Sequence, residues 1–156
     1  MSWDELVLIP DWVQALQVVI RLFIAALLGG IVGYERERKG KAAGIRTHML
    51  VCLGTALIII VARLDGIPQA EMSKVIEGVV AGIGFLGSGV ILKLSQEREI
   101  WGITTAASIW TTAAIGLAVG LGQVWIAVIS LIVVWVILFV LGYWEKQVWK
   151  MQQDKA

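Results

Sequence analysis

Five long apolar stretches constrain the fold of this chain more than any other feature. They cover residues 12–33, 47–64, 72–93, 102–121 and 123–143. Each has about the 20 residues that a helix needs to cross ~30 Å of hydrocarbon. Of the 156 residues, 58% are hydrophobic and only 16% are charged, a balance that soluble domains do not show. The sequence therefore predicts an all-α polytopic membrane protein with five transmembrane helices.

Basic residues gather on one side of these five spans. Ten of them follow spans one, three and five, namely Arg36, Arg38, Lys39, Lys41, Arg46, Lys93, Arg98, Lys146, Lys150 and Lys155. The positive-inside rule then predicts an N-terminus outside and a C-terminus in the cytoplasm. We assign residues 1–144 to a transmembrane domain and residues 145–156 to a short cytoplasmic tail. The first eleven residues contain no Lys or Arg, so we expect span one to be retained and not cleaved as a signal peptide.

Small residues recur every four positions along several spans. Because lipid is as apolar as leucine, membrane helices associate where small side chains let their backbones approach. The residues expected at such contacts are Gly29 and Gly33 in span one, Gly78, Gly82, Gly84, Gly87 and Gly89 in span three, and Ser108, Thr112, Gly116 and Gly120 in span four. This pattern predicts a centre formed by spans one, three and four, with span five facing lipid.

Two ionisable residues lie inside the apolar spans. Arg21 is nine residues into span one, ~13 Å from its outer end, and Glu77 lies near the outer end of span three. An isolated charge at such depth costs at least ~2.5 kcal/mol, so it usually finds a partner or a wet cavity. Arg21 and Glu77 are therefore a candidate intramembrane polar pocket for an ion or proton. They could equally be an ion pair that fixes helix register, or Glu77 could pair with Lys74 or Arg63.

The basic segment between spans one and two is a second candidate site. Its order suggests an anion or partner site on the inner face, with Gly44 at positive φ, Thr47 capping span two, and Arg46 and His48 projecting from that helix N-terminus. The residues assigned to it are Glu35, Arg36, Gly44, Arg46, Thr47 and His48, together with Thr104 and Thr105 at the start of span four. The alternative is a plain basic linker that meets anionic lipid headgroups.

Enzyme and cofactor chemistry find no support in the residues. A single histidine, His48, and a single cysteine, Cys52, give no metal-ligand cluster and no catalytic constellation. The segment from Gly82 to Gly87 matches G-x-G-x-x-G, but it lies within a span and follows no strand, so it does not indicate dinucleotide binding. With a net charge of +1, nothing indicates nucleic acid. We expect no catalytic residue, no metal and no cofactor.

Four ordered sequence blocks resemble a known family. They are GGIVGYER at 29–36, AGIRTHMLVCLG at 43–54, GIGFLGSGVI at 82–91 and GITTAASIW at 102–110. Together with Arg21, they make the chain similar to the MgtC/SapB membrane proteins over roughly residues 21–120. The resemblance implies a multi-pass protein of the bacterial inner membrane. In that family, members are linked to growth in low magnesium and to virulence, and some act on other membrane proteins such as the F-type ATP synthase.

Some residues depart from the family pattern. The chain ends twelve residues after Trp144, so we expect a short form without the soluble C-terminal domain of virulence-associated members. Trp101 and Glu77 stand where the family leads us to expect other residue types.

Two function classes follow from these observations. The first is a regulatory or accessory protein that docks on inner-membrane partners through its glycine-rich helices or its basic loop. The second is a small oligomeric transporter or channel, for magnesium or another ion, that uses Arg21 and Glu77. The lipid bilayer is the common partner of both classes, and a homo-oligomer is the default assembly.

Overall fold

The computed structural model describes residues 11–93, 100–142 and 144. Its five long helices are α2 (Trp12–Arg38), α3 (Ile45–Leu64), α4 (Met72–Val90), α5 (Ile103–Gly120) and α6 (Val124–Val136), and α6 continues into a π-helical turn, η1 (Ile137–Leu141). Counted from Val124 to Leu141, the last helix joins the other four in being long and apolar enough to cross a membrane. The prediction of an all-α chain with five transmembrane helices is confirmed. The predicted tail at 145–156 lies outside the described residues.

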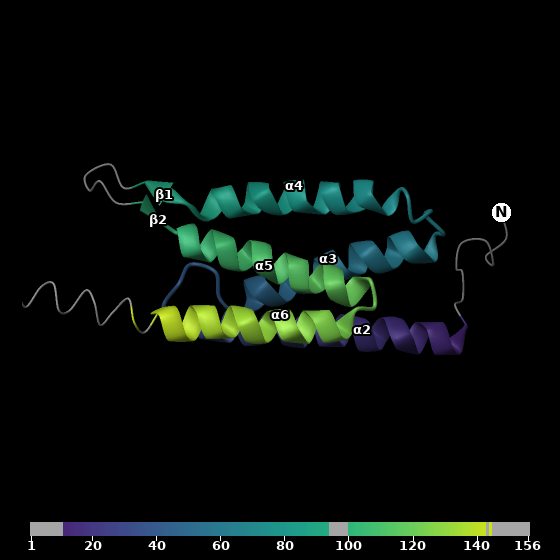
Figure 1. The fold of residues 1–156 in the computed structure, drawn as a ribbon, viewed down its shortest axis with the longest axis horizontal. Helices are drawn as coiled ribbons and strands as arrows, with labels where there is room; N and C mark the ends of the chain where they lie inside the picture. Colours follow the sequence, from purple (N-terminus) through teal and green to yellow (C-terminus); the bar gives the residue numbers. More distant parts are fainter. Residues whose placement is uncertain (1–10, 94–99, 143, 145–156) are drawn as a thin grey trace, which may run out of the picture.

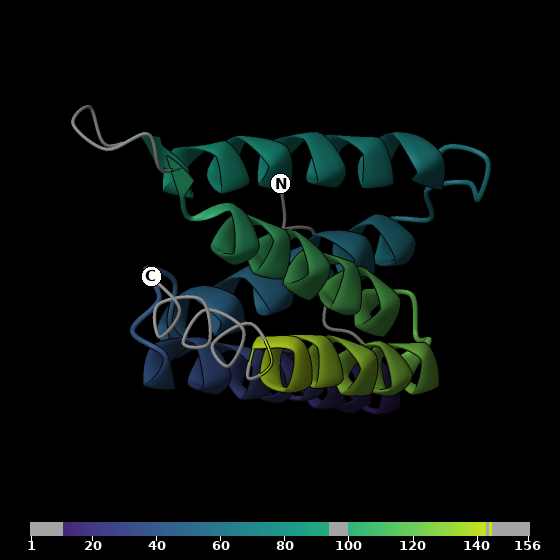
Figure 2. The same cartoon turned by 60° about the vertical axis from the view of Figure 1, so that its left-hand side comes forward.

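The helices run roughly parallel or antiparallel, in three layers (Figure 1). In Figure 2, α4 forms one outer layer, α3 and α5 lie in the middle, and α2 and α6 form the opposite layer. The α2–α3 connection, the end of α6 and the two short strands lie at one end of the bundle. These strands, β1 (Leu92–Lys93) and β2 (Ile100–Trp101), pair antiparallel. We call this end the basic end, because Arg36 to Arg46 lie there.

The centre of the bundle is formed by α2, α3 and α5. Glycines let these helices approach closely, because a Cβ added at Gly29 would lie 2.5 Å from the His48 carbonyl oxygen, and one at Gly120 would lie 2.8 Å from the Ala56 carbonyl oxygen. Gly116 likewise faces the backbone of Cys52. The expected centre of spans one, three and four is therefore wrong in one member, because span two takes the place of span three.

Helix α4 is peripheral and packs mainly on α5. Its buried contacts come from Val79, Ile83 and Gly87, and Gly87 faces Ala106 at 3.6 Å from its added Cβ position. No described atom lies within 4 Å of a Cβ added at Gly78, Gly82, Gly84 or Gly89. The small residues of α4 are therefore mostly not used in packing within the chain.

Helix α6 buries one narrow stripe against the centre. Ala127, Leu131 and Leu138 are buried together with Val32 and Ile115, while its other large side chains are exposed. This agrees with the expectation that span five faces lipid.

Candidate functional site at the basic end

The last turns of α2 bury two charged side chains at the basic end. Glu35 is 6% exposed and Arg36 is 2% exposed, and the fully buried His48 lies on α3 close by in the same interface. The burial follows from Gly33, because a Cβ there would lie 2.6 Å from the Ile45 Cα. This close approach of α2 and α3 encloses the residues that follow Gly33. The structure thus places Glu35, Arg36 and His48 in the interior and not on a solvated linker.

His48 links α3 to α5 through polar contacts. Its Nδ1 lies 2.9 Å from the Gly44 carbonyl oxygen, and its Nε2 lies 3.2 Å from the Ser108 hydroxyl oxygen. Since a carbonyl can only accept, Nδ1 carries the proton of a neutral ring and Nε2 accepts from Ser108. The Ser108 hydroxyl can also donate to the Thr105 carbonyl oxygen at 2.8 Å. His48, Ser108 and Thr105 therefore form one buried polar connection between two helices.

Lys39 ties the end of α2 to the end of α6. Its Nζ donates to the Leu138 carbonyl oxygen at 2.6 Å and lies 2.5 Å from Glu35 Oε1 in an ion pair. The same Nζ lies 5.8 Å from the centre of the Phe139 ring. The sequence analysis did not include Lys39 in the site. The i, i+4 spacing of Glu35 and Lys39 on a helix was the available signal.

Several buried polar atoms of this cluster lack a partner among the described residues. Arg36 Nε and Nη2 have no hydrogen bond, and neither oxygen of Glu35 accepts one with good geometry. The remaining contact of Arg36 is a distant one, from Nη1 to Glu35 Oε2 at 3.6 Å. Buried polar groups are nearly always satisfied in native proteins, and an unsatisfied one costs roughly 1–3 kcal/mol. The cluster therefore has unused hydrogen-bonding capacity.

The start of α3 differs from the sequence expectation. Gly44 has a φ of −101°, and Thr47 makes no capping hydrogen bond. Instead, Glu37 Oε2 accepts a hydrogen bond from the Ile45 N–H at 2.9 Å, so a carboxylate already occupies this helix terminus. Arg46 and Thr47 are exposed. The expected Thr47 cap and positive-φ Gly44 are therefore wrong.

The start of α5 is shaped by a different glycine. Gly102 has a φ of 96°, and a Cβ there would meet the Val90 carbonyl oxygen. Thr104 is exposed and caps nothing, whereas Thr105 and Thr112 are buried. Of the two threonines expected in the site, Thr105 alone joins the buried cluster, through its backbone carbonyl.

Arg21 and Glu77 are not brought together. The Arg21 Nη2 lies 3.3 Å from the Cβ position of Gly122, in the α5–α6 turn opposite the basic end, and Glu77 is exposed on α4. Both ion pairs found among the described residues involve Glu35. Arg21 is level with a helix end because α2 has 27 residues, about 40 Å of helix, and its first turns extend past that turn. It is therefore less deeply placed than its position in span one suggests.

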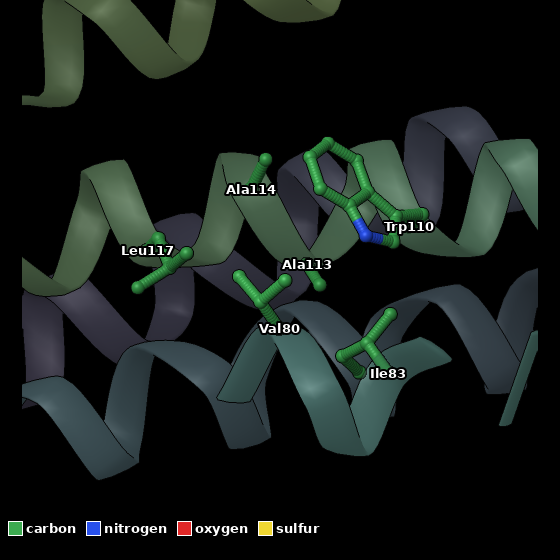
Figure 3. Close-up of a pocket in the computed structure, with 6 residues that line it drawn as sticks. All are labelled: Val80, Ile83, Trp110, Ala113, Ala114 and Leu117. Carbon is green, nitrogen blue, oxygen red and sulfur yellow. The ribbon is translucent and has the colours of Figure 1, made fainter. Parts of the chain in front are cut away.

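A small groove between α4 and α5 is apolar. Figure 3 shows its lining from Val80 and Ile83 on one helix and from Trp110, Ala113, Ala114 and Leu117 on the other. It offers no charged side chain to an ion. Among the described residues, no group of three His, Cys, Asp or Glu side chains could hold a metal ion.

Known proteins are similar to this chain over most of its length. It is 44% identical over 115 residues to the "Putative magnesium transporter YhiD" of Escherichia coli K12, covering 69% of this chain and 52% of that protein. It is 42% identical over 123 residues to "Protein SrpB" of Synechococcus elongatus, covering 72% and 66%. It is 38% identical over 105 residues to "Protein MgtC" of Salmonella typhimurium, covering 67% and 44%.

The chain thus spans about half the length of the relatives it matches. No solved structure is significantly similar to it. The model of the MgtC family matches residues 22–147, which include all five helices except the first turns of α2. The chain belongs to the MgtC family of membrane proteins.

Proposed function

We propose that this chain is an accessory protein of the bacterial inner membrane that docks on other membrane proteins when magnesium is scarce. Its family and a relative named MgtC support the link to magnesium. The basic residues of the α2–α3 connection support an orientation with the basic end in the cytoplasm.

The open face of α4 is the observation that carries this proposal. Gly78, Gly82 and Gly89 fall within about 40° of one another around a helix with 3.6 residues per turn, and Phe85 lies on the same stripe. The three glycines face open space, and Phe85 is 79% exposed. We call these four residues the α4 stripe.

Lipid cannot explain the glycines of the α4 stripe. A helical glycine costs about 1 kcal/mol relative to alanine, and in lipid it returns no packing. Against a neighbouring helix it allows close backbone contact. The stripe is therefore suited to a helix of another protein, with Phe85 as its bulky anchor.

A pair of matched variants tests this proposal. Gly82→Leu fills the α4 stripe, and Gly54→Leu makes the same change on α3, where a Cβ also has open space. Tagged versions are purified from membranes of cells grown in low magnesium, and co-purified membrane proteins are quantified. We expect Gly82→Leu to lose a partner that Gly54→Leu retains, together with growth in low magnesium. Unchanged recovery and growth for Gly82→Leu would rule out docking through this stripe.

An ion transporter is the second candidate, favoured by the printed name of the YhiD relative. It predicts magnesium flux into sealed proteoliposomes, and loss of that flux on Arg21→Ala or Glu77→Ala in protein that still inserts. Since Arg21 and Glu77 lie apart in one chain, a shared pathway would need a second copy. Absence of flux from folded protein would reject the transporter and leave the docking proposal standing.

A further inference from the structure

We propose that the buried Arg36–Glu35 pair is a binding site for a phosphate-type oxyanion that carries a hydroxyl group. Free hydrogenphosphate and the headgroup of a phosphomonoester lipid share this chemistry. The site is independent of the α4 stripe and does not depend on the docking proposal.

The unpartnered atoms of Arg36 define the first half of the site. Nε and Nη2 are the two nitrogens on one edge of the guanidinium, and both lack a hydrogen bond, while Nη1 on the other side faces Glu35. Two parallel N–H donors on one edge match the spacing of two oxygens of a carboxylate or phosphate. Because Arg36 is 2% exposed, an anion held there would be shielded from water, which strengthens the contact.

The charges around Arg36 favour one bound negative charge. Arg36 and Lys39 are two cations against the single carboxylate of Glu35, which already has Lys39 Nζ at 2.5 Å. This leaves an excess of one positive charge in a buried cluster. A buried charge is usually paired, so an anion would complete the balance. The same two cations disfavour Mg²⁺ at Glu35.

Glu35 supplies the specificity. Its Oε2 has no hydrogen bond in the described structure and can only accept when ionised. A plain anion such as sulfate would place an acceptor against this acceptor and be repelled. A phosphate-type ligand can instead turn a P–O–H group toward Oε2 while its other oxygens accept from Arg36. The pair therefore predicts preference for phosphate over sulfate.

Lys39 controls access to the pair. Its side chain is 24% exposed and reaches from Glu35 to the Leu138 carbonyl oxygen, so it covers the carboxylate on the side of α6. Lysine side chains change rotamer rapidly, and releasing the Leu138 contact would uncover Glu35. We infer that ligand enters on this side.

The test uses the full chain in nanodiscs made of phosphatidylcholine. Binding of inorganic phosphate, sulfate and Mg²⁺ is measured by calorimetric titration. Arg36→Lys keeps the charge but removes the paired donors, and Arg38→Lys is the matched control, since Arg38 is exposed two residues away. We expect phosphate binding without sulfate binding, weakened about tenfold or more by Arg36→Lys and unchanged by Arg38→Lys. Glu35→Gln should narrow the preference for phosphate, because an amide can also donate to sulfate.

A second arm separates the two sources of the ligand. Nanodiscs with a few per cent phosphatidic acid replace free phosphate, and lipid that co-purifies with the wild type and with Arg36→Lys is quantified by mass spectrometry. Enrichment lost in Arg36→Lys assigns the site to the lipid, whereas calorimetric binding of phosphate alone assigns it to the free ion. The proposal is overturned if neither ligand binds, if sulfate binds equally well, or if folded Arg36→Lys and Arg38→Lys behave alike. Should Arg36→Lys not fold, the loss of phosphate preference in Glu35→Gln decides the question.

Discussion

Replacing one glycine by alanine at two positions should change stability in opposite directions. At Gly33, the new Cβ would lie 2.6 Å from the Ile45 Cα and 2.8 Å from the Gly44 carbonyl oxygen. Carbon atoms pack best at about 3.5–4.0 Å, so α2 and α3 would have to separate by roughly 1 Å. The contacted atoms are backbone and cannot rotate away. At Gly82 the same Cβ meets open space.

The magnitudes follow from two competing effects. Overpacking costs about 1–3 kcal/mol, and removing a helical glycine returns about 1 kcal/mol. Gly33→Ala should therefore lose up to about 2 kcal/mol, whereas Gly82→Ala should gain up to about 1 kcal/mol. At roughly 2–4 °C per kcal/mol for a chain of this size, the two melting temperatures should differ by several degrees.

Thermal unfolding in one detergent measures this difference. The chain contains eight tryptophans, so intrinsic fluorescence reports the transition without a label. Both variants are compared with the wild type as monodisperse protein. A Gly33→Ala variant as stable as Gly82→Ala would refute the close α2–α3 approach, and with it the reason given for the burial of Arg36.

Three further variants test contacts of the basic end and of the α5 start. Ser108→Ala leaves His48 Nε2 without its partner and should destabilise the protein by about 1–3 kcal/mol; the exposed Ser73→Ala should not, by the same melting assay. Lys39→Met removes the closest cation from Glu35 and should lower the melting temperature, and adding Glu35→Gln should restore much of the loss; no recovery in the double variant contradicts the pairing. Gly102→Ala combines a strained φ of 96° with a clash at Val90 and should cost more than Gly66→Ala, whose φ of 73° has no clash; equal chemical-denaturation midpoints would contradict this.

The fold was predictable because apolar length alone identifies membrane helices. The five spans agree with the helices to within a few residues, except that α2 continues to Arg38. The charged residues Glu35 to Arg38 hid this continuation, since a membrane span is recognised by its lack of charge. Burial of Glu35 and Arg36 depends on α3 packing against α2, which no local pattern reports.

The neighbours of each helix were harder to predict. A repeat of small residues shows that a helix can be approached closely, but not from which chain. The glycines of α5 face α3, whereas Gly78 and Gly82 of α4 face open space. The depth of Arg21 was misjudged for a related reason, because the sequence does not show how far one helix extends past its neighbours.

The π-helical turn η1 has a consequence for the phase of the last helix. A π-turn holds one residue more than an α-turn, and each residue turns a helix by about 100°. Deleting one residue from Ile137–Leu141 would restore ordinary winding and rotate Trp144 by about that angle around the helix. Ala127 and Leu131 lie before the turn and would keep their contacts with the centre. A single-codon deletion could thus redirect whatever follows α6 without rebuilding the bundle.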